Sequence, residues 1–123
     1  MFNLKLEGLI NFVLGFLWIY QGLVPKILFT QPEEILIWQR IGFDPNTAQL
    51  ACYFSGVSEI IFGILWLCLG YKFFHFVNIL ALILLLILLS ILQPSLLVAA
   101  FNPVVMNIAM ISLSYIYLKY LSA

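Results

Sequence analysis

Charged residues are scarce in this sequence. Asp, Glu, Lys and Arg together make up 8% of its 123 residues, whereas 65% of the residues are hydrophobic. Soluble globular domains carry roughly 25% charged residues. A chain this short has too much surface to bury so many apolar side chains in a core of its own. We therefore expect a lipid bilayer to supply the apolar environment, and the length predicts a single transmembrane domain over residues 1–123.

The lack of other reactive residues excludes several functions. The net charge is zero and there is no basic patch, so nucleic acid is not an expected partner. Cys52 and Cys68 are the only cysteines, and sixteen positions on one helix separate them by roughly 24 Å, too far for an intramolecular disulfide. No metal-binding cluster and no nucleotide-binding loop is present. The single histidine, His75, cannot form an axial pair for haem within one chain, and we expect it at the membrane interface.

Long apolar runs are what the sequence does contain. A transmembrane helix needs about 20 mostly apolar residues, and four runs meet this requirement. None alternates as a strand does, so the predicted fold is all-α, a bundle of four transmembrane helices. We expect these helices at about residues 8–24, 48–70, 73–92 and 103–121. The first run lacks a small-x-small cleavage site, so we expect it to be retained rather than removed as a signal peptide.

The connection between the first two predicted helices has a structure of its own. Pro32, Glu33 and Glu34 are typical of a helix start, and Gly42 can end that helix. We predict a short helix at about residues 32–42. It is too short to cross the membrane, so we expect it to lie at the interface.

The basic residues predict how the chain is oriented. Lys5, Lys72 and Lys119 fall on one side of the predicted bundle, and Lys26 and Arg40 fall on the other. Cytoplasmic loops carry an excess of lysine and arginine. The bias of three to two therefore predicts that both termini are cytoplasmic.

Glu59 interrupts the apolar run from Ala51 to Leu69. Counted from Thr47, it lies about 18 Å along a helix, near the middle of a hydrocarbon core about 30 Å thick. An ionisable side chain at that depth is a functional-site hypothesis by default. The carboxyl group can be protonated, because lipid disfavours its charged form, or it can pair with a cation.

The first two predicted helices each carry a stripe of small and polar residues. The stripe of the first is Gly8, Asn11, Gly15, Trp18 and Gly22, and that of the second is Cys52, Ser55, Gly56, Glu59, Gly63 and Trp66. Spacings of three and four place such residues on one helix face, and small residues let membrane helices approach closely. We therefore expect these helices to pack tightly with Glu59 between them; the alternative is that the glycines serve packing alone.

Several polar groups are candidate partners of Glu59. We favour Tyr20, Gln21 and Tyr53, followed by Lys26 and then Arg40. In the last two predicted helices Asn78 and Asn107 are the clearest polar groups within the membrane. We expect both to form hydrogen bonds between helices.

Residues 8–70 resemble the DoxX-like family of small four-helix membrane proteins. The resemblance rests on Gly15, Trp18, Gly22, Pro25–Lys26, Pro32–Glu33, Gly42, Ser55–Gly56, Glu59 and Gly63. Families of this group typically close the first helix with a glycine and a lysine and carry a Gly-x-x-Glu-x-x-x-Gly pattern in the second. The resemblance implies a four-helix bundle. Members include a membrane subunit linked to thiosulfate:quinone oxidoreduction and others associated with redox or oxidative-stress systems.

Three functions follow from these patterns. The first is the binding of a quinone-like or other apolar ligand by a protein of the bacterial inner membrane, in or beside a redox system. Glu59 would handle a proton in that site, and the other candidate ligand-binding residues are Lys26, Trp18, Tyr20, Gln21, Tyr53, Trp38 and Arg40. The alternatives are a non-catalytic subunit that anchors a redox partner or larger complex, and a small proton-coupled transporter. Self-association is a further prediction, and catalysis is left open.

Overall fold

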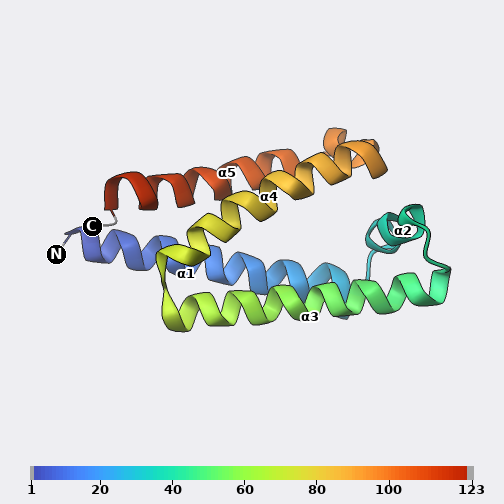
Figure 1. The fold of residues 1–123 in the computed structure, drawn as a ribbon, viewed down its shortest axis with the longest axis horizontal. Coiled ribbons are helices and arrows are strands. Elements are labelled where there is room, and N and C mark those ends of the chain that lie inside the picture. The colour runs from blue at the N-terminus through green and yellow to red at the C-terminus, as the bar shows by residue number, and fades with distance from the viewer. Residues whose placement is uncertain (1, 122–123) are drawn as a thin grey trace. The chain divides into compact units, whose positions relative to one another are not determined.

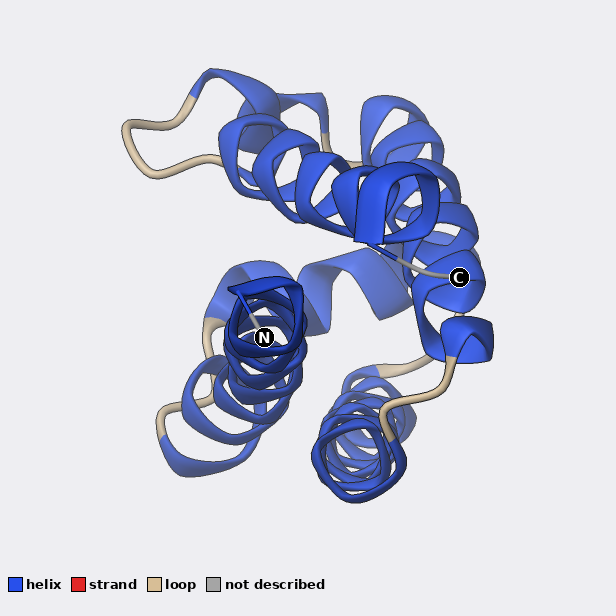
Figure 2. Cartoon of the chain, turned by 90° about the vertical axis from the view of Figure 1, so that its left-hand side faces the viewer, coloured by secondary structure: helices blue, strands red, loops and turns tan. Residues whose placement is uncertain are grey.

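The computed structural model describes residues 2–121, which are helical almost throughout and include no strand (Figure 1, Figure 2). The all-α prediction is therefore confirmed. The elements in chain order are α1 (Phe2–Leu23), η1 (Val24–Leu28), α2 (Pro32–Ile41), α3 (Pro45–Leu69), α4 (Lys72–Leu92), η2 (Pro94–Val98), α5 (Pro103–Ile116) and η3 (Tyr117–Leu121).

Four helical segments are long and apolar enough to cross a membrane. They are Lys5–Leu28, Pro45–Leu69, Lys72–Leu92 and Pro103–Leu121. These segments confirm the four predicted spans, with ends that differ by a few residues. Large apolar side chains such as Leu80, Leu84 and Ile87 are exposed on α4. Acyl chains rather than water suit such a surface, so the chain is a membrane protein.

The helix ends follow local chemistry visible in the sequence. The Asn102 side chain accepts a hydrogen bond from the Val105 N–H at 3.1 Å and caps α5, as expected of Asn before Pro. Gly42 ends α2 with a φ of 126°, and Gly70 separates α3 from α4 with a φ of 64°. Positive φ strains residues that carry a Cβ, so glycine suits both positions.

The sequence predicts that the first helix ends at about residue 24, just before Pro25, but the helical backbone continues to Leu28 as the π-helical turn η1. Proline has no N–H to donate to the preceding turn, which removes one bond of the α-helical pattern. The wider turn is closed by the Phe29 N–H, which donates to the Val24 carbonyl at 2.9 Å. This turn carries Lys26 within the first membrane span.

The helices belong to two compact units. The first contains the chain up to Leu14 and from Leu69 onward, and the second contains Gly15–Cys68. The helix α1 contributes its first part to the first unit and its last part to the second. Within the first unit α4 and α5 pack side by side (Figure 1). That the whole chain acts as a single domain stays a prediction.

Glycines set the packing of α1 against α3 in the second unit. A Cβ on Gly22 would overlap the Gly56 carbonyl oxygen, and a Cβ on Gly56 would lie 2.7 Å from the Gly22 carbonyl oxygen. One further contact repeats this pattern, because a Cβ on Gly63 would lie 2.6 Å from the Gly15 carbonyl oxygen. The backbones therefore meet where neither helix has a side chain. The predicted tight packing of these two helices is confirmed.

Replacement of Gly22 by alanine should separate these helices. The added methyl group would strike backbone, which cannot move aside cheaply, so we expect Gly22→Ala to destabilise the protein by about 1–3 kcal/mol. The matched control is Gly8→Ala on the same helix, where a Cβ meets nothing within 4 Å. That variant should be neutral or more stable by up to about 1 kcal/mol, because alanine favours the helix. Thermal unfolding in detergent measures both, and equal losses would contradict the glycine contact.

Candidate functional site

Lys26 lies at the centre of a polar cluster in the second unit. Its ammonium group donates to Ser55 Oγ at 2.8 Å and to Glu59 Oε1 at 3.0 Å. The Glu34 Oε2 atom lies 3.8 Å from the same ammonium. The turn η1, the start of α2 and the middle of α3 thus converge on one cation. We call these four residues the Lys26 cluster.

The Lys26 backbone is held in place as well as its side chain. Its carbonyl oxygen accepts from Thr30 Oγ1 at 2.9 Å and from Cys52 Sγ at 3.8 Å. A lysine side chain has many rotamers, and fixing its backbone lowers the entropy that remains to be lost on pairing. The two bonds therefore support the position of the ammonium group beside Glu59.

The glycine contact leaves the room that this pair needs. A Cβ on Gly22 would lie 3.0 Å from Glu59 Cβ, and a Cβ on Gly56 would lie 3.1 Å from Lys26 Cβ. Each glycine therefore faces one partner of the pair. The same residues that bring α1 and α3 together also admit the two charged side chains between them.

The Lys26 cluster is shielded and contains more acid than base. The exposed fractions of the Lys26 and Glu59 side chains are 13% and 15%, and that of Glu34 is 27%. Burial raises the pKa of the Glu34 carboxyl group, and the nearby Lys26 ammonium offsets part of that rise. One cation thus faces two carboxyl groups, which gives the site an affinity for a proton or for a further hydrogen-bond donor.

One atom of the cluster has its bonding capacity unused. Glu59 Oε2 is buried and has no hydrogen-bond partner. A buried acceptor left unpaired costs roughly 1–3 kcal/mol, and more when it is charged. A hydrogen-bond donor placed beside Oε2 would recover that free energy. Within the cluster, this atom is therefore where a ligand can gain most binding free energy.

The partner of Glu59 in the structure is Lys26. The sequence-based prediction ranked Lys26 behind Tyr20, Gln21 and Tyr53. The Tyr53 hydroxyl instead accepts from Gln49 Nε2 at 3.0 Å, and Tyr20 is 48% exposed with its ring beside Phe16. Gln21 is half-buried on α1. The sequence favours neutral polar partners because it predicts Lys26 just beyond the end of the first helix. The π-helical turn keeps it within the span.

The remaining predicted ligand-binding residues take three different positions. Trp18 is buried and meets Phe62 edge-on at 5.0 Å between ring centroids, three residues along α3 from Glu59. Trp38 stacks on Phe43 at 5.8 Å, and Arg40 is exposed in the last turn of α2. Among the predicted residues the structure thus pairs Lys26 with Glu59 directly, and Trp18 of α1 contacts Phe62, which follows Glu59 by three residues on α3.

A second polar cluster lies in the first unit, and sequence reasoning missed its centre. His75 is fully buried, so the prediction that it lies at the interface is wrong. Its Nδ1 atom lies 3.0 Å from Ser114 Oγ, and its Nε2 atom lies 2.8 Å from Asn11 Oδ1. The ring stacks on Tyr117 at 3.9 Å between centroids. An Asn oxygen can only accept, so Nε2 donates and Nδ1 accepts from the serine hydroxyl.

Asn78 extends this cluster and fulfils its predicted role. Its amide donates to Ser114 Oγ at 2.7 Å, and the Asn107 amide donates to the Leu82 carbonyl at 3.3 Å. The expected hydrogen bonds between helices are therefore confirmed. The sequence signal that could have placed His75 inward is its spacing of three from Asn78, which puts both on one face of α4. His75, Asn78 and Ser114 are buried and Asn11 is half-buried, and their bonds tie α4 to α5 and to the first part of α1.

No group of three or more His, Cys, Asp or Glu side chains within residues 2–121 is arranged to hold a metal ion. The two polar clusters differ from each other in the groups that they offer. One offers a cation, a hydroxyl group and two carboxyl groups, and the other offers only neutral donors and acceptors.

Loss of the Ser114 hydroxyl group should weaken the first unit. Ser114→Ala leaves the Asn78 amide and His75 Nδ1 without this partner, and we expect a loss of about 1–2 kcal/mol. Ser112 is the matched control, because its hydroxyl bonds only the Ile108 carbonyl of its own helix on an exposed face. Ser112→Ala should change stability by less than about 0.5 kcal/mol. Unfolding in detergent compares the two, and an unchanged Ser114→Ala variant would show that the cluster contributes no stability.

Comparison with known proteins identifies the family. The sequence pattern described as the DoxX-like family matches residues 15–115, which include the Lys26 cluster, His75 and Asn78. Neither a curated protein nor a solved structure matches the chain. The match extends the resemblance of residues 8–70 into the last two spans. The chain, with its four membrane-spanning helices, belongs to the DoxX-like family.

Proposed function

We propose that this DoxX-like protein binds a quinone-like ligand at the Lys26 cluster and acts in or beside a membrane redox system. The observation that carries the proposal is Glu59 Oε2, a buried acceptor without a hydrogen-bond partner, next to a cation that is already held by Ser55. Apolar ligands that enter from a bilayer need an apolar surrounding and a few convergent polar groups. The Lys26 cluster offers both within the second unit.

The residues present suit a ligand of this class. A hydroxyl group on the ligand would donate to Glu59 Oε2, where an acceptor is unused. The Phe62 ring lies one turn further along α3 with the Trp18 ring packed against it, and the two rings would supply an aromatic wall. A quinone-type headgroup supplies reversible proton-coupled electron transfer when it is bound.

The roles of the chain's own residues then follow from their contacts. Glu59 Oε2 would take a proton from the hydroxyl group that it binds, while Lys26 compensates the carboxylate on its other oxygen. Ser55 orients the ammonium group, and Glu34 supplies a second carboxyl group at 3.8 Å that can share the positive charge. Thr30 and Cys52 hold the backbone from which Lys26 extends.

Binding of a short-tailed quinol tests the proposal. We expect Glu59→Gln to weaken the binding of decylubiquinol in nanodiscs about tenfold or more, because it replaces the acceptor Oε2 by a donor. A hydrogen bond to a charged group is worth about 1.5–3 kcal/mol, and 1.4 kcal/mol is tenfold in affinity. Glu33→Gln is the matched control, because Glu33 is an exposed acid on α2 beside Glu34. Equal affinity of Glu59→Gln and the unaltered protein, measured by tryptophan quenching, would refute quinol binding at this site.

We further propose that the protein lies in a bacterial inner membrane with both termini in the cytoplasm. The proposal rests on Lys5, Lys72 and Lys119, which outnumber Lys26 and Arg40 on the opposite side. A membrane-impermeant amine reagent applied to intact cells should leave Lys5 and Lys119 unmodified and should modify both after the cells are opened. Modification of both lysines from the outside of intact cells would reverse the orientation.

A further inference from the structure

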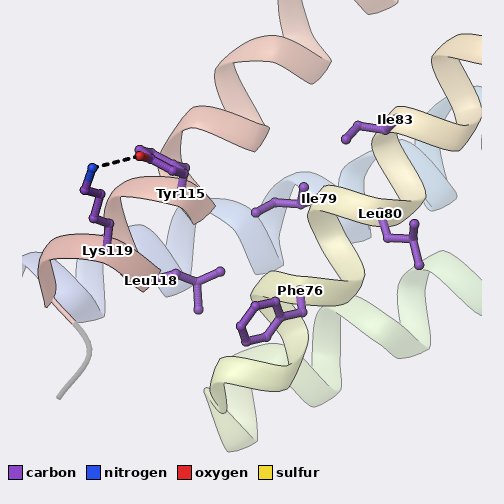
Figure 3. Close-up of a pocket in the computed structure, with 7 residues that line it drawn as sticks. All are labelled: Phe76, Ile79, Leu80, Ile83, Tyr115, Leu118 and Lys119. Carbon is purple, nitrogen blue, oxygen red and sulfur yellow. Dashed lines mark hydrogen bonds between the residues drawn. The ribbon is translucent and has the colours of Figure 1, made fainter.

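An apolar groove of about 600 Å³ runs along the surface of the first unit (Figure 3). Four of its lining residues, Phe76, Ile79, Leu80 and Ile83, belong to α4. Tyr115 and Lys119, from α5 and η3, stand at the other side. The groove belongs to the part of the surface that the membrane spans expose, so its natural occupant comes from the bilayer.

The length of the groove is comparable with that of an acyl chain in one leaflet. Phe76 and Ile83 are seven residues apart on α4, which corresponds to about 10 Å. One leaflet contributes roughly half of a hydrocarbon core that is about 30 Å thick. The groove therefore holds about two thirds of the depth that an acyl chain occupies in one leaflet.

The polar end of the groove offers two donors. Lys119 Nζ donates to the Tyr115 hydroxyl oxygen at 3.1 Å, as the dashed line in Figure 3 marks. The ammonium also lies 5.6 Å from the ring centroid of Tyr120, close enough for a cation–π attraction. The ammonium retains further N–H groups and the tyrosine hydroxyl retains its own proton, so both can donate to a phosphate oxygen.

Depth and charge match a lipid headgroup. Lys119 is exposed and lies two residues before the end of the span Pro103–Leu121, at the level where headgroups begin. The same end of the first unit carries Lys72 at the start of α4 and Lys5 near the start of α1, against the single acid Glu7. This end is therefore positive and complements an anionic headgroup.

We propose that this groove binds an anionic phospholipid, with one acyl chain along α4 and the phosphate on Lys119 and Tyr115. Apolar walls alone give no preference over bulk lipid, because acyl chains are as apolar as the leucine side chains they would meet. Selectivity therefore comes from the headgroup, and the concave wall fixes where the lipid sits. None of these residues belongs to the Lys26 cluster. A test of lipid binding in the groove is therefore independent of a test of quinol binding.

The headgroup arm of the test compares phosphatidylglycerol with phosphatidylcholine of identical chains, retained by the detergent-purified protein in native mass spectrometry. We expect roughly a fivefold preference for phosphatidylglycerol. Lys119→Gln should abolish it, and Tyr115→Phe should reduce it while keeping the ring. Lys5→Gln, an exposed lysine outside the groove, is the matched control and should retain the preference. A loss in Lys5→Gln as large as that in Lys119→Gln would reveal a diffuse surface potential and overturn the proposal.

The second part of the test uses a substitution that fills the groove without changing the charge of the protein. Ile83→Trp places a large ring in the groove and should lower retention of both lipids several-fold. Ile87→Trp is the control, because Ile87 is exposed on the same helix one turn further along and does not line the groove. Equal retention by Ile83→Trp and Ile87→Trp would show that lipid does not occupy the groove, whatever the headgroup arm finds.

Discussion

The backbone contact between α1 and α3 is the constraint on which the Lys26 cluster depends. Gly22 and Gly56 let each helix place its carbonyl oxygen where a Cβ would otherwise stand. A membrane offers no hydrophobic force between helices, so close van der Waals packing must hold them together. The short distance also decides the chemistry, because it brings Lys26 within 3.0 Å of Glu59 while leaving too little space for larger neighbours. Packing and charge pairing are thus two results of one contact.

The Lys26 cluster and the cluster around His75 satisfy their polar groups in opposite ways. In the second unit the cluster holds formal charges, leaves one carboxyl oxygen without a partner and is partly accessible. In the first unit His75, Asn78 and Ser114 form a neutral, directed chain of hydrogen bonds with no exposed member. A neutral and saturated network gains nothing from a ligand, whereas an unsaturated charged one does. The contrast explains why the function is assigned to Lys26 and Glu59, although His75, Asn78 and Ser114 also lie within membrane spans.

Local and periodic signals made much of this structure predictable. Hydropathy located four spans, and the spacing of Gly15, Gly22, Gly56 and Gly63 identified the packed faces. The positions of side chains that depend on contacts between distant segments were not predictable from these signals. Lys26 points inward because a proline converts the end of the first span into a π-helical turn, and Glu34 joins it because α2 folds back. His75 was misplaced because a position near a helix end suggests the interface, while its burial depends on Asn11 and Ser114 from distant segments.

The order of residues in the Lys26–Glu59 pair has a consequence for biosynthesis. An isolated charge near the centre of a membrane helix costs about 2.5–3.5 kcal/mol on insertion scales. Lys26 precedes Glu59 by 33 residues, so the lysine leaves the ribosome first. If the spans enter the bilayer in the order of their synthesis, the span that carries the acid enters when its counter-ion is already there. Assembly in that order spares α3 from residing in lipid with an uncompensated carboxylate.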